Sequence, residues 1–215
     1  MAQIFPRWTV KLPLYIVIGV LFLGANAVGF IWYYGSPKYT DVGYRPTQPV
    51  PYSHLVHAGN LGMDCRYCHN FVETSENAGV PPTQTCMNCH TMVLPESEKL
   101  LPIRESFATG KPMEWVRIHK IPDYAYFNHS VHIRAGVGCY TCHGNIRQME
   151  VVQQEKPLSM SWCLDCHRNP EMYLRPDSLI TDMNWTPPPN QKELAAKIIK
   201  EKKLAPPENC SACHR

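Results

Sequence analysis

The feature that most restricts what this chain can become is a short pattern, Cys-x-x-Cys-His, which occurs five times. The five copies use all ten cysteines of the 215 residues, so no thiol remains for a disulfide or a free nucleophile. The copies are Cys65/Cys68/His69, Cys86/Cys89/His90, Cys139/Cys142/His143, Cys163/Cys166/His167 and Cys210/Cys213/His214. In this pattern each thiol can bond one vinyl group of a porphyrin, and the histidine can bind its iron. The sequence therefore predicts five covalently bound c-type haems.

Two other uses of Cys-x-x-Cys pairs have to be weighed, namely a disulfide framework and zinc knuckles. Neither requires a histidine directly after the second cysteine, whereas here it follows every time. We therefore favour haem attachment. The histidines of the five motifs are then the proximal iron ligands: His69, His90, His143, His167 and His214.

Five histidines lie outside the motifs, one for each iron that needs a ligand on its second face. They are the candidate distal ligands: His54, His57, His119, His129 and His132. Four of them form two His-x-x-His units, each a few residues before a motif, so the chain repeats one haem-binding unit. By analogy with small class III cytochromes, the first histidine of a unit binds the next haem in sequence and the second binds a different one.

Methionine is an alternative ligand for one haem. Met160 stands three residues before Cys163, and Met149 lies nearby. A thioether in place of an imidazole raises the potential of a haem, although a methionine more often simply packs against its surroundings. If Met160 or Met149 binds iron, one of the five histidines does not.

An iron with an imidazole on both faces has no open position for substrate, so this ligand set indicates electron transfer and no catalytic residue. The sequence contains no phosphate-binding loop, dinucleotide fingerprint or catalytic triad. A formal net charge of +3 gives no reason to expect nucleic-acid binding.

The N-terminal part predicts a membrane anchor. Residues 1–11 form a short basic segment, and residues 12–34 carry no charge over a length that suffices to cross a bilayer. A cleavable signal peptide is the competing interpretation, because Ala25-Asn26-Ala27 resembles a cleavage site. The apolar run continues past it to Tyr34, which favours an uncleaved anchor. Haem attachment in bacteria takes place outside the inner membrane, so we expect the haem domain on the periplasmic or extracellular side.

After the anchor, residues 35–52 predict an extended linker, since Pro37 and three further prolines oppose a helix. Residues 53–215 predict the pentahaem domain, with modules of about 53–118 and 119–215. We expect little regular secondary structure: short helices and loops around five haems, including helices near 96–101 and 190–203. Asn190 and Glu193 suggest a capping box for the latter, and Pro206-Pro207 its end. An extended segment is expected around His119.

Three stretches resemble the pentahaem cytochrome subunit of alternative complex III, a bacterial quinol:electron-acceptor oxidoreductase. They are the run from His119 to His132, the nearby segments Cys139–Gly144 and Gln148–Val152, and Leu158-Ser-Met-Ser-Trp-Cys-Leu-Asp-Cys-His-Arg-Asn-Pro170. The resemblance implies partner subunits: a large iron–sulfur subunit, polytopic quinol-binding membrane subunits and a monohaem cytochrome c. It also implies a soluble electron acceptor or terminal oxidase downstream.

Two other functions fit parts of the sequence. One is a stand-alone membrane quinol dehydrogenase that feeds a periplasmic reductase, a class that carries four haems. The other is a multihaem redox enzyme with one five-coordinate haem. A high-spin signal would favour the latter, and quinol oxidation by the isolated chain would favour the former.

Overall fold

The computed structural model describes residues 4–214, which divide into a unit that ends at Asp41 and a unit that begins at Val42. The first unit contains η1 (Arg7–Lys11), α1 (Leu12–Tyr34) and α2 (Pro37–Thr40). Pro13 lies in the first turn of α1, where its missing N–H costs no hydrogen bond. Among the described residues, Arg7–Tyr34 is the one helix long and apolar enough to cross a membrane. Of the predicted N-terminal segment 1–11, residues 1–3 lie outside the described part.

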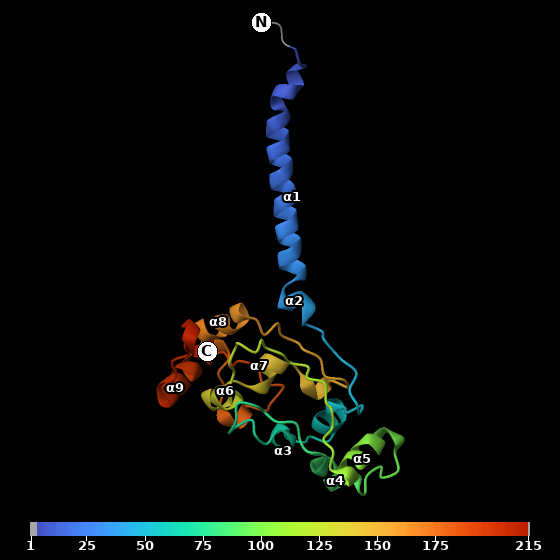
Figure 1. The fold of residues 1–215 in the computed structure, drawn as a ribbon. Helices are drawn as coiled ribbons and strands as arrows, with labels where there is room; N and C mark the ends of the chain where they lie inside the picture. Colours follow the sequence, from blue (N-terminus) through green and yellow to red (C-terminus); the bar gives the residue numbers. More distant parts are fainter. Residues whose placement is uncertain (1–3, 215) are drawn as a thin grey trace. The chain divides into compact units, whose positions relative to one another are not determined.

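The second unit is built from short helices joined by loops, and residues 42–214 contain no β-strand (Figure 1). Only two isolated bridges occur in this part, Ala125–His214 and Val137–Leu174. The helices that carry or flank histidines and cysteines are η2 (Leu55–Asn60), α3 (Cys65–Cys68), α4 (Thr83–His90), α6 (His129–Ala135), α7 (Cys139–His143), α8 (Met160–Arg168) and α10 (Cys210–Cys213). The others are η3 (Glu98–Leu100), α5 (Leu101–Thr109), η4 (Ile146–Gln148), η5 (Pro170–Met172), η6 (Asp177–Leu179) and α9 (Gln191–Lys202).

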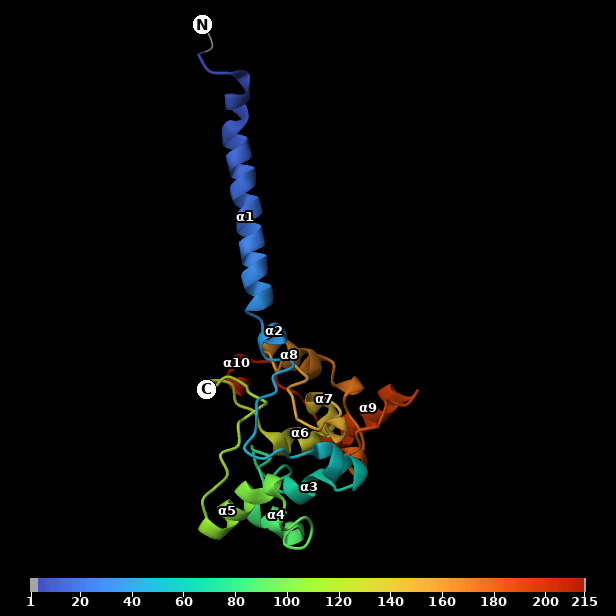
Figure 2. The same cartoon turned by 90° about the vertical axis from the view of Figure 1, so that its right-hand side faces the viewer.

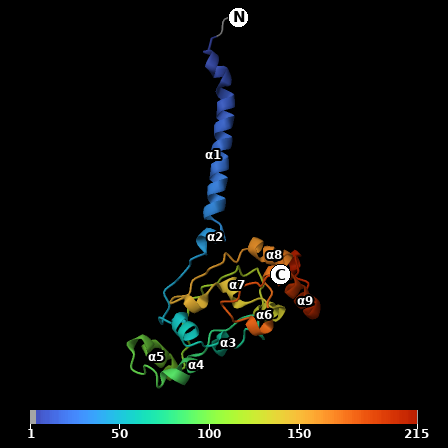
Figure 3. The same ribbon diagram turned by 180° about the vertical axis from the view of Figure 1, so that it is seen from behind.

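The hydrophobic core of this unit is small and divided. One cluster consists of Val50, Met87 and Ile103, where α4 packs against α5; the three views show these two helices side by side (Figures 1, 2 and 3). The other consists of Ala195 and Ile198 on α9 and of Leu174, against which they pack. Only nine hydrophobic residues of the described chain are buried. So few buried side chains leave much of the apolar surface to be covered by something other than the chain itself.

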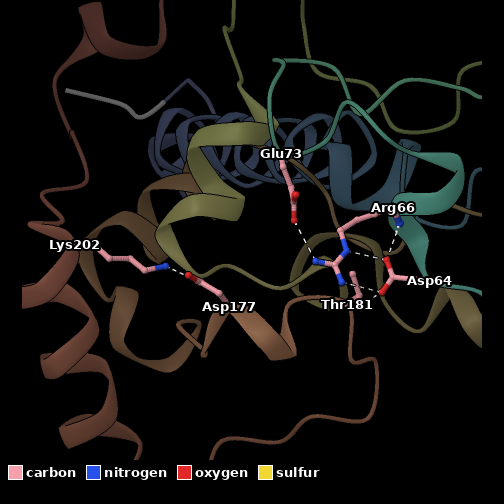
Figure 4. A network of polar contacts seen from close by, with 6 residues as sticks. All are labelled: Asp64, Arg66, Glu73, Asp177, Thr181 and Lys202. Atoms are coloured by element: carbon pink, nitrogen blue, oxygen red, sulfur yellow. Dashed lines mark hydrogen bonds and ion pairs between the residues drawn. The ribbon is translucent and has the colours of Figure 1, made fainter.

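Polar contacts tie distant segments together (Figure 4). Asp64 accepts a hydrogen bond of 3.0 Å from Thr181, 117 positions later in the chain, and of 2.8 Å from the Arg66 side chain. Lys202, in the last turn of α9, pairs with Asp177 (Figure 4). It also donates to the carbonyl oxygen of Arg134, at 2.6 Å. These contacts join α3 to the segment that follows η6, and α9 to η6 and α6.

Four sequence expectations about secondary structure need correction. Pro37 does not oppose a helix but begins α2, because a proline fits the first turn. The side chain of Asn190 makes no capping bond at the start of α9, so the predicted capping box does not form. The helix expected near 190–203 is present as α9, but it ends at Lys202 because Lys203 adopts a left-handed conformation (φ 53°), and not because of Pro206-Pro207. The helix expected over 96–101 is a 3-10 turn followed by α5.

Candidate functional site

The two cysteines of each Cys-x-x-Cys-His motif lie on a short helix; we number these attachment sites 1 to 5 in chain order: α3, α4, α7, α8 and α10. The motif histidines of sites 1 and 5, His69 and His214, directly follow the ends of their helices. Residues three apart on a helix share a face, so the two thiols of each site lie on the same side. Side-chain caps start two of these helices: Asp64 accepts from the Arg66 N–H at 2.9 Å, and Ser159 from the Trp162 N–H at 3.4 Å. The caps stabilise helices that are too short to persist alone.

The ten thiols predicted to hold haem are not covered equally by the chain. Cys89 at site 2 and Cys210 at site 5 are exposed, whereas the other eight cysteines are partly buried. At site 2 the difference arises within one motif, because Cys86 packs against the core cluster of Val50, Met87 and Ile103 and Cys89 does not. The sequence, which treats the two thiols of a motif alike, does not predict this difference. The chain does not enclose Cys89, so its attachment to haem is inferred from the motif alone and stays a prediction.

The histidines share a hydrogen-bonding arrangement that prepares them for metal binding. Seven of the ten histidines in the described chain place Nδ1 at 2.6–3.1 Å from a backbone carbonyl oxygen. An Nδ1–H that donates to a carbonyl leaves Nε2 unprotonated, with its lone pair free for iron, and fixes the ring orientation. The seven are His57, His69, His90, His129, His132, His167 and His214.

Three motif histidines each face a histidine from outside the motifs, at a nearly constant separation. The ring centroids are 6.2 Å apart for His57 and His90, 6.4 Å for His129 and His143, and 6.1 Å for His132 and His167. An iron that binds one imidazole nitrogen on each face, with bonds of about 2 Å, holds the two centroids roughly 6 Å apart. The residues present therefore fit a haem iron held between two imidazoles at sites 2, 3 and 4.

Burial keeps several of the candidate iron-binding histidines in the neutral form at pH 7, and the neutral imidazole is the form that binds a metal. It lowers the pKa of His54 and of His119 to about 4 each, and that of His143 to about 3. Burial also lowers the pKa of His129 and of His132. These groups would not carry a positive charge against an iron.

Two candidate distal ligands are placed differently from the rest. The Nδ1 of His54 is buried and has no hydrogen-bond partner among the described residues, and after burial the charge of His69 is the main cause that lowers its pKa. The Nε2 of His119 lies 3.2 Å from Nδ1 of His143, the ring nitrogen for which other motif histidines use a backbone carbonyl. His119 therefore approaches the Nδ1 side of the His143 ring and not the Nε2 that would bind iron.

The methionine candidates are not placed alike. Met160 begins α8 and its side chain is largely exposed, whereas Met149 is half-buried and its carbonyl oxygen accepts from the Leu55 N–H at 3.0 Å. At site 5 the ring of Tyr124 lies near that of His214, with centroids 5.8 Å apart. The Tyr124 carbonyl oxygen also accepts from Nδ1 of His214 at 3.1 Å.

Comparison with known proteins assigns the chain to a family. Residues 125–215 match the family described as cytochrome c7 and related cytochrome c. The chain is also 30% identical over 147 residues to the menaquinone reductase multihaem cytochrome c subunit of Nitratidesulfovibrio vulgaris, an alignment that covers 57% of this chain and 68% of the relative. The chain is a multihaem c-type cytochrome. This confirms the fold class expected from the sequence: short helices, no strands among residues 4–214, and one N-terminal apolar helix.

One feature of this cytochrome is missed when only cysteines, histidines and methionines are considered. An aromatic residue stands two positions before each His-x-x-His unit, Tyr52 in the first and Phe127 in the second, and contacts both histidines of its unit. The sequence contains this repeat, because Tyr-x-His-x-x-His and Phe-x-His-x-x-His have the same spacing. The structure shows what the spacing is for, since in both units it brings the aromatic ring into contact with both histidines.

Proposed function

We propose that this cytochrome transfers electrons through five haems and converts no substrate itself. The observation that carries the proposal is the separation of 6.1–6.4 Å in three histidine pairs, which suits an iron with an imidazole on each face and would leave no open position there. A six-coordinate haem iron changes oxidation state without changing its ligands, which suits electron transfer. Reaction at an iron would need a displaceable ligand.

The ligand set follows from the motifs and the pairs. We propose that the ten motif cysteines hold the haems and the five motif histidines bind iron proximally. His57 is then the distal ligand at site 2, His129 at site 3 and His132 at site 4. His54, whose pKa is lowered by burial and by the charge of His69, is our candidate at site 1. His119, Met160 and Met149 remain the candidates for the one position left, at site 5.

We also propose a spatial order of the sites that differs from their order in the chain. Sites 1 and 2 are neighbours, because His54 and His57 lie three residues apart and Asn88 donates to the Tyr67 hydroxyl at 3.4 Å. Site 1 neighbours site 3, because Nδ1 of His129 lies 2.7 Å from the Glu76 carbonyl oxygen and the Ser130 N–H donates to Ser75. Site 2 is therefore at one end of the series.

The second half continues the series. Sites 3 and 4 are neighbours because His129 and His132 share one turn of α6 and face His143 and His167. Site 5 adjoins site 4: Nδ1 of His167 lies 2.7 Å from the Pro207 carbonyl oxygen, three residues before Cys210. The proposed order is 2–1–3–4–5, with sites 2 and 5 as the places where electrons enter and leave.

Exposure of the thiols supports this choice of ends. The two exposed cysteines, Cys89 and Cys210, belong to sites 2 and 5, and every cysteine of sites 1, 3 and 4 is partly buried. A haem edge beside an exposed thioether can approach a partner protein closely, whereas an edge covered by the chain cannot.

We place this cytochrome in a membrane complex that exchanges electrons with a quinone pool, of the alternative complex III type. Helix α1 would anchor it to the bacterial inner membrane by a single pass, with the haem domain (residues 53–215, after a linker of 35–52) on the periplasmic or extracellular side. The expected partners are an iron–sulfur subunit, polytopic quinol-binding subunits and a monohaem cytochrome c. The name of the relative, a menaquinone reductase subunit, supports a quinone-linked complex.

That name also favours a second candidate, in which electrons run toward the quinone rather than away from it. The proposed series of haem sites is compatible with electron transfer in either direction, because electrons can pass along the same sites toward the quinone or away from it. The partner proteins, and the potentials that they impose at sites 2 and 5, decide the direction.

The proposal is tested on the chain purified in mild detergent with whatever co-purifies. We expect five covalent haems per chain in a pyridine haemochrome assay and mainly bis-imidazole bands in near-infrared magnetic circular dichroism. We expect reduction of the haems by menaquinol when the membrane subunits are present, and none by the isolated chain. Far fewer than five haems, or carbon monoxide binding to most of the irons, would contradict electron transfer through closed sites.

A further inference from the structure

The aromatic residue before each His-x-x-His unit makes the same two contacts in both units. Tyr52 meets His54 edge-on, with centroids 4.8 Å apart and planes at 87°, and stacks on His57 at 4.5 Å and 23°. Phe127 meets His129 edge-on at 4.8 Å and 86°, and stacks on His132 at 4.4 Å and 28°. The two geometries agree although His57 lies on the π-helix η2 and His132 on the α-helix α6.

The spacing explains the stacking contact in the second unit. Asn128 is the N-cap of α6, so Phe127 precedes the cap and His132 is the fourth helical residue. Side chains at these two positions commonly pack together as a hydrophobic staple, which fixes the direction from which the chain enters the helix. Here the second partner is an imidazole, so the staple also fixes the plane of a ring.

In each unit the second histidine, which stacks on the aromatic ring, also makes a hydrogen bond through its Nδ1. Nδ1 of His57 lies 2.9 Å from the Ser53 carbonyl oxygen, and Nδ1 of His132 lies 2.8 Å from the Asn128 carbonyl oxygen. In both units that carbonyl belongs to the residue between the aromatic ring and the first histidine. A ring stacked on one face and hydrogen-bonded at Nδ1 cannot rotate freely about its Nε2 axis.

We propose that Tyr52 and Phe127 are positioning residues that set the planes of the histidines in their units. The inference rests on the proposed function, since it assumes that these imidazoles bind iron. Each aromatic ring holds one imidazole edge-on and the other face-on, and those two imidazoles belong to neighbouring haems. One side chain thus fixes the ligand orientation of two haems at once.

Ligand planes have a direct spectroscopic signature. In a low-spin ferric haem with two imidazoles, nearly parallel planes give three resolved g-values in electron paramagnetic resonance. Nearly perpendicular planes give a single broad feature at low field. The planes are at 10° for His129 and His143, 38° for His132 and His167, and 64° for His57 and His90. We therefore expect a resolved spectrum from site 3 and a broad low-field feature from site 2.

The test compares Phe127→Leu and Phe127→Tyr in the full chain. Leucine keeps an apolar side chain but removes the flat face, so the signals of sites 3 and 4 should shift while the low-field feature of site 2 stays. Tyrosine keeps the ring and should leave the whole spectrum unchanged. Tyr52→Leu and Tyr52→Phe repeat the comparison in the first unit, where the leucine variant should shift the site 2 feature and spare site 3. The two units are independent, so a leucine variant that fails to load its haems leaves the other to decide.

Two results would overturn the inference: a spectrum of a haem-loaded leucine variant identical to that of the wild type, or a shift spread over all haems. Failure of the proposed function is separate and is seen before any variant is made. It would appear as missing haems or high-spin iron in the wild-type protein.

Discussion

The pairing of His57 with His90 offers the sharpest test of the ligand assignment. His57 lies in the first His-x-x-His unit, close in sequence to site 1, yet its ring faces the histidine of site 2 at 6.2 Å. The substitution His57→Ala should open the iron at site 2 and leave the other irons closed. It should not open site 1, although Cys65 is nearer to it in the sequence.

The expected magnitude follows from the number of sites. With five attachment motifs in the chain, one opened site is about one fifth of the haem iron. His57→Ala should therefore bind about one carbon monoxide per chain in the reduced state, against almost none for the wild type. His57→Met should keep the iron low-spin and raise the potential of that haem alone.

The opened haem is identified by removing attachment sites. In a Cys86→Ala/Cys89→Ala background, His57→Ala should add no carbon monoxide binding, because the haem that it opens is absent. In a Cys163→Ala/Cys166→Ala background the binding should persist. The variant His132→Ala is the matched control and should show the reverse dependence, because its ring faces His167 at 6.1 Å. Difference spectra at the Soret band measure the binding, and a haemochrome assay normalises it.

Undiminished carbon monoxide binding by His57→Ala in the background that lacks site 2 would refute the pairing. So would a high-spin fraction well above one fifth, which would mean that His57 supports several sites through the fold.

Three further outcomes can be checked. The hydrogen bond from Arg66 lowers the pKa of Asp64 to about 2, so this carboxylate stabilises the fold above pH ~4 and the contribution is lost as the pH falls toward 2. Both side chains are partly exposed, so Asp64→Asn should cost no more than about 1 kcal/mol at pH 7 in denaturant unfolding, and the difference from wild type should shrink at low pH. Leu174→Ala should cost about 2–5 kcal/mol, because Leu174 is only 2% exposed; the half-exposed Met172→Ala should cost under about 0.5 kcal/mol, and equal losses would contradict the assigned core. Replacing residues 1–41 by a cleavable signal should give a soluble, haem-loaded protein in cell fractionation, and loss of haem loading would contradict the division at Asp41.

Much of the chemistry could be predicted from the sequence because it depends on local spacing. Two thiols and a histidine within five residues define an attachment site wherever the chain goes, so the family followed from the motifs. The uncharged run from Leu12 to Tyr34 likewise predicts a helix by its own composition, and α1 has these bounds. The histidines outside the motifs could be counted, but the sequence alone could not say which iron each one faces.

The tertiary structure decided what depends on contacts between distant segments. It placed His57 against His90 and His132 against His167, put His119 beside Nδ1 of His143, and gave Tyr52 and Phe127 their contacts with the histidines. It also left Cys89 exposed while Cys86 of the same motif packs against the core, and it ended α9 at Lys202, ahead of the prolines expected to end it. The physical reason is that a covalent attachment needs only neighbours in sequence. The second ligand of an iron is supplied by whichever segment the folded chain brings to its other face.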